Sequence, residues 1–472
     1  MNAMQFRFTP VVIALAAVLG GCAIGPGYER PVVADAAAWK GATAAEGWLP
    51  AAPADLLDRG AWWQLFADAD LNGLVERVQV SNQNIAVAAA NYAQALALVR
   101  EQRATLFPSL ALSGGASRNG NRNGDRSTAT GSADLSLGAS WTPDVWGRLR
   151  LAVGSAVAQA QASEADLAAA RLSAQGLLAS NYFSLREADA ELALVAETLT
   201  GYERSLTITQ NRYQAGIAAQ SDVSQAQTLL ANTRADRVAL QRSRDALEHA
   251  IAVLVGVDPA DFSVPVLAAW TPVVPSVPLG VPSTLLQRRP DIAAAERSVA
   301  VANAQIGIQR SAYYPSLSLS ASLGRSSSAV SDLFSASNLL WSLGLSATQV
   351  LFDAGAIGAR VDAARASYDA SVASYRQTVL AAFQAVEDQL TATASLAQQE
   401  VLRREASAAA DRTEQQILNR YRAGQVSYTE VVTAQATALN ARRTVLQVLV
   451  SRQNAAVGLV QGLGGGWSAT LR

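Results

Sequence analysis

Histidine and cysteine, which most often carry metal binding and nucleophilic chemistry, each occur once in this sequence of 472 residues. His249 has no second histidine with which to share a metal ion, so it is expected to be structural. A hydrolase that uses paired carboxylates is compatible with the composition, but no acid pair recurs in a glycine-rich loop at a strand end. We therefore expect no enzyme, no catalytic residues, no cofactor and no metal.

Cys22 follows a pattern that gives it a different chemistry. Arg7, the apolar run at 10–19 and the small residues before Cys22 predict a secretory signal peptide at 1–21, too short to span a bilayer as a mature helix. A bacterial lipoprotein signal would leave Cys22 as a lipidated, palmitate-bearing N-terminus. Ala23 in place of Asp predicts sorting to the outer membrane. The alternative is an ordinary buried thiol, and a single cysteine excludes an internal disulfide.

A polar stretch that could form a binding surface occurs twice, as NRYQAGIAAQSDVSQAQ at 211–227 and NRYRAGQVSYTEVVTAQ at 419–435. The shift between the copies is 208 residues, and upstream a shift of 207 carries 107–113 onto 314–320. The chain is therefore a tandem duplication of a unit of about two hundred residues, too long for a solenoid repeat. This favours a pseudo-symmetric ring or barrel.

Long helices must position these stretches. The segments 147–213 and 355–421 have no proline and are rich in helix-forming residues, which predicts two helices of about 100 Å. Return helices about half as long are predicted at 222–256 and 430–463. Apolar spacing from Leu71 to about Thr105 predicts one further helix of about 35 residues. Alanines at core spacing would allow antiparallel coiled-coil pairs to close into a barrel, although these helices alone also fit a soluble coiled-coil scaffold.

At 106–142 and 314–349 the pattern changes to a period of two, with apolar residues alternating with Ser and Gly. This predicts two hairpins, four strands in all, of the kind that forms a transmembrane β-barrel wall. The edge of a soluble β-sandwich is the alternative. Because four strands cannot enclose a lumen, we expect the chain to assemble with copies of itself. A trimer would supply 12 strands, with Ser and Gly facing a wet pore.

The remaining segments connect these elements. Seven of the fifteen prolines lie within 257–290, which predicts an extended crossover between a first repeat at 68–256 and a second at 291–464. Prolines also predict an extended segment within 22–67, and the glycine-rich tail at 465–472 is expected to be disordered.

The charge balance excludes one class of partner. The chain is 50% apolar with a net charge of −1, so it can bury a large core and has no positive excess for nucleic acid. The arginines at 237, 242 and 244 are interpreted as a solvated helix face rather than an anion site.

Several motifs together resemble the TolC-like outer-membrane efflux lipoproteins of the NodT branch, and the resemblance covers nearly the whole mature chain. They are Cys22, Gly25-Pro26 with Tyr28 and Arg30-Pro31, Trp62-Trp63 with Phe66 and Asp68, Val281-Pro282-Ser283 before Arg289-Pro290-Asp291, and the twice-occurring Arg-Tyr-x-x-Gly.

The resemblance implies a mostly α fold with a membrane β-barrel. Three chains would form a 12-stranded β-barrel in the outer membrane and a helical barrel in the periplasm. The homotrimer would be the exit duct of a tripartite pump, coupled through a periplasmic adaptor to an inner-membrane transporter, typically of the resistance-nodulation-division type. It would pass small molecules such as drugs or toxic compounds. Type I protein secretion and a pore-less periplasmic lipoprotein scaffold are the alternatives.

The repeated turns would lie together at the periplasmic tip, about 100 Å from the membrane by the helix rise. Gly216 and Gly424 fit helix ends with a left-handed backbone, and Ser427 with Glu430 fits a capping box. Simple turn formation explains these residues equally well. The functional interpretation is that the turns dock the adaptor and close the duct at rest. The residues expected there are Arg212, Tyr213, Gly216, Ser221, Asp222, Arg420, Tyr421, Gly424 and Ser427.

The resemblance also implies that Tyr421 and Asp222 help to hold the tip closed. The acidic ring position of the family, three residues after Glu430, is Thr433 here, and the arginine found in some members is Val426. These departures argue against a strong cation-binding ring and leave Glu430 as the acid nearest the constriction. The expected gate residues are Asp222, Tyr421, Glu430 and Thr433.

Overall fold

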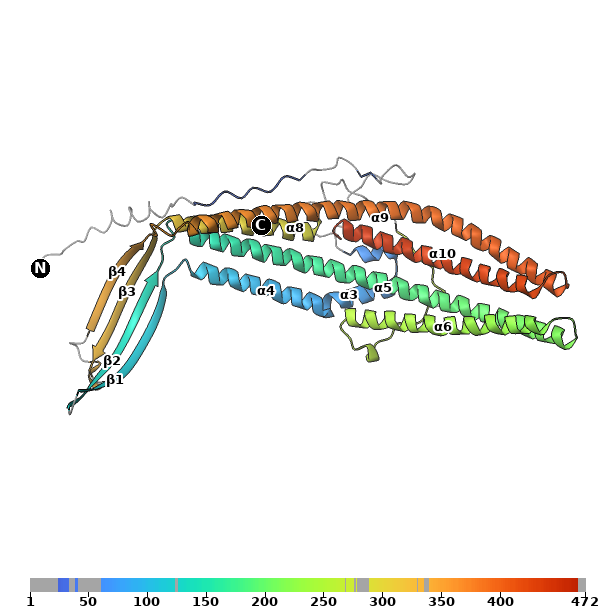
Figure 1. Cartoon of the computed structure of the whole chain (residues 1–472), viewed down its shortest axis with the longest axis horizontal. Helices are drawn as coiled ribbons and strands as arrows, with labels where there is room; N and C mark the ends of the chain where they lie inside the picture. The colour runs from blue at the N-terminus through green and yellow to red at the C-terminus, as the bar shows by residue number, and fades with distance from the viewer. Residues whose placement is uncertain are drawn as a thin grey trace. The chain divides into compact units, whose positions relative to one another are not determined.

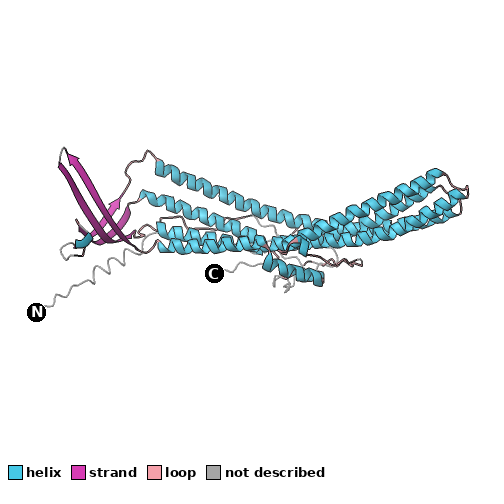
Figure 2. Cartoon of the chain, turned by 90° about the horizontal axis from the view of Figure 1, so that it is seen from below, coloured by secondary structure: helices cyan, strands magenta, loops and turns pink. Residues whose placement is uncertain are grey.

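The computed structural model describes residues 24–33, 39–40, 61–123, 126–267, 269–275, 277, 288–328, 330–334 and 339–465. The predicted signal peptide, Cys22, the 281–283 motif and all but the first residue of the predicted tail lie outside these residues. Helix makes up most of the described chain (Figure 2). The described residues divide into two compact units. The sheet unit contains residues 24–32, Asn91–Glu164 and Ala294–Arg376. The second unit, named the hairpin unit for its two pairs of antiparallel helices, contains all the other described residues, which fall within 33–90, 165–293 and 377–465.

In the sheet unit, period-two alternation builds one antiparallel sheet with the strands in the order β1-β2-β3-β4 (Figure 1). The four predicted strands are confirmed. Their bounds are β1 Ser109–Asn123, β2 Arg126–Trp141, β3 Ser316–Ser327 and β4 Leu339–Thr348.

The register of the sheet separates leucines from serines. Leu112 lies opposite Leu137, and Leu137 lies opposite Leu323 on the next strand. Because successive side chains of a strand point to opposite faces, serines occupy the other face. The leucine face is open within one chain, since Leu112 is 72% exposed and Leu343 is 75% exposed.

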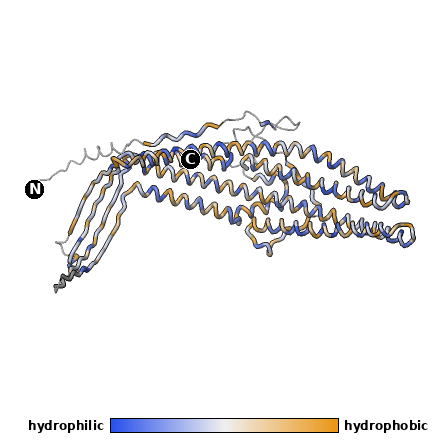
Figure 3. Tube along the Cα trace, viewed as in Figure 1, coloured by the Kyte–Doolittle hydropathy of each residue, from blue (hydrophilic) through white to orange (hydrophobic). Residues whose placement is uncertain are grey.

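The two long helices predicted from the absence of proline are present as α5 (Arg148–Gln214) and α9 (Ala356–Arg422). Each is followed by a 35-residue return helix, α6 (Gln220–Leu254) or α10 (Tyr428–Gly462). Figure 3 shows hydrophobic and hydrophilic positions interspersed along these helices. Of the helices in the described ranges, none has the length and apolar character needed to cross a membrane.

The prediction of one 35-residue helix between Leu71 and Thr105 is wrong, because the chain forms α3 (Ala69–Ser81) and α4 (Gln83–Ala104). Asn82 between them has extended backbone angles. Its side-chain oxygen accepts from the Ile85 N–H at 3.1 Å, and its amide donates to the Leu254 carbonyl at 2.8 Å. Asn82 therefore caps the start of α4 and binds the end of α6, contacts that apolar spacing does not reveal.

A glycine with positive φ follows each return helix at a close backbone contact. A Cβ added at Gly256 would lie 2.3 Å from the Ser81 carbonyl oxygen, and one at Gly464 would lie 2.2 Å from the Arg288 carbonyl oxygen. The second return helix meets the start of α8 (Pro290–Arg310), where Arg289 donates to the Gly462 carbonyl at 3.1 Å. The duplication thus reproduces the same junction in both repeats.

Buried ion pairs hold the crossover segment against the helices. Arg186 on α5 has no exposed surface, lies 3.1 Å from Asp189 and donates to the Pro265 carbonyl at 2.6 Å. Arg244 on α6 lies 3.0 Å from the other oxygen of Asp189 and donates to the Val264 carbonyl at 2.6 Å. Among the described residues between 257 and 277, one short 3-10 turn, η2 (Pro259–Asp261), is present, and the others are in neither helix nor strand.

This arrangement corrects the interpretation of the arginines at 237, 242 and 244 as one solvated face. Arg237 and Arg242 are exposed, but Arg244 is buried. The reason is Asp189, a buried carboxylate on another helix that needs a cationic partner. A local charge pattern does not show such a partner.

The motif near the N-terminus lies along the helices of the sheet unit. Asn303 on α8 donates to the Pro26 carbonyl at 3.1 Å, and Tyr28 hydrogen-bonds Glu296. Arg30 donates to the Tyr375 hydroxyl at 3.3 Å. These contacts give the Gly-Pro, Tyr and Arg residues of the resemblance a structural role.

Candidate functional site

The two repeated turns of the hairpin unit have the same backbone geometry. Gly216 (φ 74°) donates to the Tyr213 carbonyl at 2.9 Å, and Gly424 (φ 76°) donates to the Tyr421 carbonyl at 2.9 Å. The residue after each glycine donates to the carbonyl one residue earlier, Arg212 or Arg420, at 2.8 and 2.9 Å. A left-handed glycine with this paired bonding is a common helix ending.

The start of α10 has the predicted capping geometry. The Glu430 side chain accepts from the Ser427 N–H at 3.3 Å and from its hydroxyl at 3.4 Å. Asp222 occupies the first turn of α6, where a negative charge stabilises the helix N-terminus. Ala219, the N-cap residue of this helix, makes no side-chain capping hydrogen bond.

Aromatic residues join the two turns. The Arg212 guanidinium lies 4.9 Å from the centre of the Tyr421 ring and donates to the Arg422 carbonyl at 3.3 Å. The Tyr421 ring packs edge-on against Tyr428, with 5.3 Å between ring centres. Tyr421 and Tyr428 form a buried cluster with Ala226 and Val431, named here the turn cluster.

Hydroxyl groups of α5 pair with both tyrosines of the turn cluster. Tyr421 donates to the Thr209 hydroxyl at 3.4 Å, and the Tyr428 and Ser205 hydroxyls lie 3.3 Å apart. Burial raises the pKa of the Tyr428 hydroxyl above its usual value, and the nearby Tyr421 and Asp222 add to the rise. The Tyr428 phenol therefore stays neutral and acts as a hydrogen-bonding group.

The predicted site residues fall into two groups. Arg212 and Tyr421 are brought together, and Tyr421 is only 4% exposed. Asp222 is partly buried, and within the described residues the Tyr421 hydroxyl pairs with Thr209 rather than with Asp222. The exposed residues are Tyr213, Gly216, Ser221, Arg420, Gly424, Ser427, Glu430 and Thr433.

Sequence reasoning missed Tyr428, Ser205 and Thr209. The duplicate position of Tyr428 is Gln220, so the comparison of repeats gave no signal there. The apolar spacing of Tyr428 and Val431 at the start of α10 could have indicated a buried position.

A second polar contact joins the helices of the hairpin unit away from the turns. Arg443 on α10 lies 2.8 Å from Glu191 on α5 and 3.5 Å from Asp236 on α6. Glu187 lies one helical turn before Glu191. Burial, with a smaller contribution from the Glu191 charge, raises the pKa of the Glu187 carboxyl to about 7.

In the sheet unit, hydroxyl pairs follow the serine face of both hairpins, and this set is named the serine ladder. Within each pair the oxygen atoms lie 2.7 to 2.9 Å apart. The pairs are Ser109 with Ser140, Ser113 with Ser136, Ser117 with Ser132, Ser318 with Ser346, and Ser322 with Ser342. Hydroxyl groups of this kind can hydrogen-bond water. Asp134, which lies between Ser132 and Ser136 on the same face of β2, adds a carboxylate to this surface.

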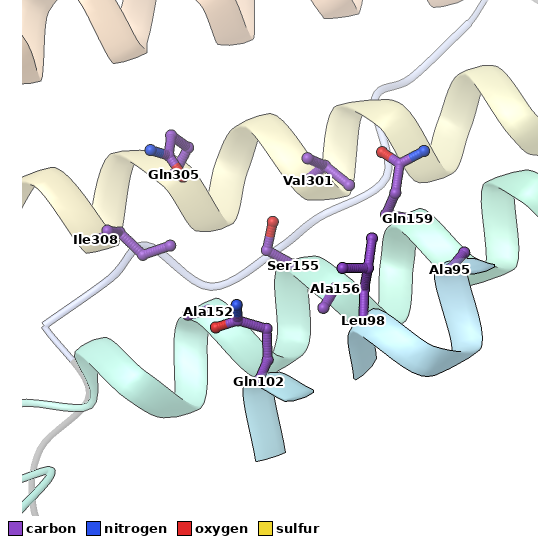
Figure 4. Close-up of a pocket in the computed structure, with 10 residues that line it drawn as sticks. All are labelled: Ala95, Leu98, Gln102, Ala152, Ser155, Ala156, Gln159, Val301, Gln305 and Ile308. Atoms are coloured by element: carbon purple, nitrogen blue, oxygen red, sulfur yellow. The ribbon is translucent and has the colours of Figure 1, made fainter. Parts of the chain in front are cut away.

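The sheet unit also has an open hollow of about 340 Å³ between α4, α5 and α8 (Figure 4). Its polar side chains are Gln102, Ser155, Gln159 and Gln305, and apolar residues form the rest of the lining. The residues that line this hollow include no acidic or basic side chain.

The comparisons with known proteins match this architecture. The family model described as outer membrane efflux protein matches residues 74–257 and 281–465, which is most of the chain. The chain belongs to the outer membrane efflux protein family. This is a family of transport proteins rather than an enzyme family, and its members are outer-membrane proteins.

Individual family members are similar over nearly their whole length. The probable efflux pump outer membrane protein TtgC of Pseudomonas putida is 33% identical over 459 residues, covering 95% of this chain and 94% of the relative. Outer membrane protein OprJ of Pseudomonas aeruginosa is 31% identical over 477 residues, covering 99% and 97%. The solved structure of the outer-membrane channel OprN superposes with a TM-score of 0.86 at 31% identity, covering 94% of this chain and all of that one.

Proposed function

We propose that three copies of this outer membrane efflux protein close into one channel through the outer membrane and serve as the exit duct of a tripartite efflux pump. The observation that carries the proposal is the sheet, which has an exposed leucine face, a serine ladder and two outer strands. An exposed leucine face on a β-sheet suits contact with lipid, and a hydroxyl-lined face suits a wet lumen. Outer strands with free backbone groups favour pairing with further copies.

Four strands per chain require copies to close a barrel, and the family likeness supports three. The helices would then continue the channel as a periplasmic barrel. The match of the family model in two stretches supports repeats at 68–256 and 291–464 with the crossover at 257–290 between them.

The partners follow from the same proposal. A relative named as a component of an efflux pump supports coupling to an inner-membrane transporter through a periplasmic adaptor. The cargo would be small molecules such as drugs or toxic compounds, and the protein itself would have no catalytic activity. A lipid on Cys22 would add an anchor in the outer membrane.

The exposed residues of the two turns are the proposed docking surface for the adaptor. The turn cluster, with Arg212 across the Tyr421 ring, would hold the two turns together at rest. Asp222, Glu430 and Thr433 would lie near the constriction.

The test combines mass and conductance. The full-length protein in mild detergent should have the native mass of a trimer and should conduct ions in planar bilayers. A Cys22→Ala variant should still fractionate with outer membranes as detergent-stable trimers, because strands rather than the lipid would hold it there. A monomer, or a variant that becomes water-soluble, would favour the pore-less scaffold instead.

A further inference from the structure

The two strand hairpins pair in equivalent registers. Ser109 lies opposite Ser140 in the first hairpin, and Ser316 lies opposite Thr348 in the second. The 207-residue shift carries Ser109 onto Ser316, and the 208-residue shift carries Ser140 onto Thr348. The strand register of the second hairpin is therefore obtained from that of the first by applying the two shifts.

The junction between β2 and β3 joins the first repeat to the second, with Ser140 opposite Ser320. Its counterpart would join the second repeat to the first, through β4 and β1. These are the outer strands of the sheet, so within one chain they are not neighbours (Figure 1). The counterpart junction can form only between two copies of the chain, and the antiparallel order of the strands permits it.

We propose that β4 pairs with β1 of the next copy in the register of the β2–β3 junction. The inference rests on the proposed trimer and deepens it. The shifts carry Ser140 onto Thr348 and Ser320 back onto Ser113. The intersubunit pair is therefore Thr348 opposite Ser113 of the partner subunit.

The chemistry of the two faces agrees with this register. It places Ser346 opposite Gly115 of the partner subunit on the serine face, and Leu345 opposite Ala116 of the partner subunit on the leucine face. A slip by one residue would turn every leucine of one strand toward the serine face. Only slips by an even number of residues keep the faces separate.

Registers that differ by an even number of residues can be distinguished by the stagger, the offset along the strands between neighbouring hairpins. Within each hairpin, the first residue of one strand pairs with a residue at the end of the other, Ser109 with Ser140 and Ser316 with Thr348. At the β2–β3 junction, Ser140 pairs with Ser320, four positions beyond Ser316, so the two hairpins are staggered by four residues. A closed barrel needs such a stagger because its strands tilt relative to the barrel axis. If Thr348 instead lay opposite Ser109 of the partner subunit, which is called the level register, the hairpins of neighbouring copies would not be staggered. Only the β2–β3 junctions would then have a stagger, and the β4–β1 junctions between copies would have none.

Cysteine pairs test the register directly. Residues directly opposite in an antiparallel pair have Cα atoms about 4.5 to 5.5 Å apart. A disulfide accepts about 4.4 to 6.8 Å. Thr348→Cys with Ser113→Cys should therefore give a covalent trimer on denaturing gels after mild oxidation. Leu345→Cys with Ala116→Cys lies three positions away, so one of the two pairs occupies a non-hydrogen-bonded site.

The matched control is Thr348→Cys with Ser109→Cys, which tests the level register. In the proposed register these positions are displaced by four residues, about 13 Å, and should cross-link at least about tenfold less. The unmodified chain, which keeps only Cys22, measures background cross-linking.

Native mass in mild detergent separates the two levels of the proposal. A trimer that cross-links through Ser109→Cys rather than Ser113→Cys, or through neither proposed pair, overturns the register and leaves the channel standing. A protein that is monomeric by native mass overturns the channel and the register together.

Discussion

At the scale of single residues, the two copies of the turn have kept their backbone and lost their equivalence in side-chain environment. Tyr213 is 45% exposed, whereas its duplicate Tyr421 is buried beneath Arg212. An arginine over an aromatic ring contributes about 0.5 to 1 kcal/mol at an exposed site and about 2 kcal/mol or more when the pair is desolvated. Because Arg212 is half-buried over a buried ring, its contact lies between these values, and it would suit the proposed closure of the tip.

Tyr421→Phe combined with Asp222→Ala is expected to raise ion conductance through the trimer in planar bilayers. The first change removes the hydrogen bond to Thr209, and the second removes the only acid in the first turn of α6. Tyr213→Phe is the matched control at the exposed duplicate position and should leave conductance unchanged. Equal conductance of the double variant and the unmodified protein would remove these residues from the gate.

Glu187 should make the thermal stability depend on pH. Its carboxyl has an unfolded pKa near 4.5 and a folded pKa of about 7, because burial opposes its ionisation. Its contribution to stability is therefore full below the unfolded pKa and is lost as the pH rises through about 7. Glu187→Gln should match the unmodified protein at pH about 5 and melt at a higher temperature at pH about 8.

The control for this pH dependence is Glu197→Gln, an exposed carboxylate on the same helix. That variant should follow the unmodified protein at both pH values. If the two variants behave alike, the raised pKa of Glu187 has no bearing on stability.

At the scale of helices and strands, the glycines after the return helices permit close backbone approach. Gly256 and Gly464 have positive φ and contact a neighbouring backbone, whereas Gly216 has positive φ in open space. Replacing Gly216 with alanine therefore tests backbone strain alone, whereas replacing Gly256 with alanine tests backbone strain together with crowding at a helix junction.

Gly216→Ala should lower the free energy of unfolding by about 1 to 2 kcal/mol, the cost of a left-handed backbone at alanine. Gly256→Ala should lower it further, because the new Cβ would lie 2.3 Å from the Ser81 carbonyl oxygen. Thermal denaturation of the two variants in detergent measures the difference. Equal losses would mean that the α3–α4 junction can move away from α6 without cost.

At the scale of the whole molecule, the proposed channel assigns opposite surroundings to neighbouring residues of β4. Leu345 is 71% exposed within one chain, and Ser346 belongs to the serine ladder. The proposal places the leucine against lipid and the serine in the lumen.

Leu345→Arg should therefore reduce the amount of trimer recovered from outer membranes, since an arginine on the lipid face costs up to about 2 to 4 kcal/mol, the most at the bilayer midplane. Ser346→Arg should leave that amount nearly unchanged. It should instead shift the reversal potential in planar bilayers toward anions, because it adds positive charge to the lumen. If Ser346→Arg reduced the amount of trimer and Leu345→Arg shifted the reversal potential, the serine face would be the one in contact with lipid.

The sequence by itself determined the duplication, the four strands with their two faces and the long helices. These features depend on local spacing: a period of two places Leu343 and Ser342 on opposite faces, and the absence of proline lets α5 continue for 67 residues. The same local rules predicted the left-handed glycines at both turns, because helix endings have strong residue preferences.

Only the tertiary structure decided which polar residues are buried and with what partner. Asn82 divides a helix because it binds the end of α6, Arg244 is buried because Asp189 lies beside it, and Tyr421 pairs with Thr209. These partners are far apart in the sequence, and hydrogen bonds or ion pairs between distant segments leave no periodic pattern in either one. Spacing along the chain reveals which face a residue occupies, but the fold decides what lies opposite that face.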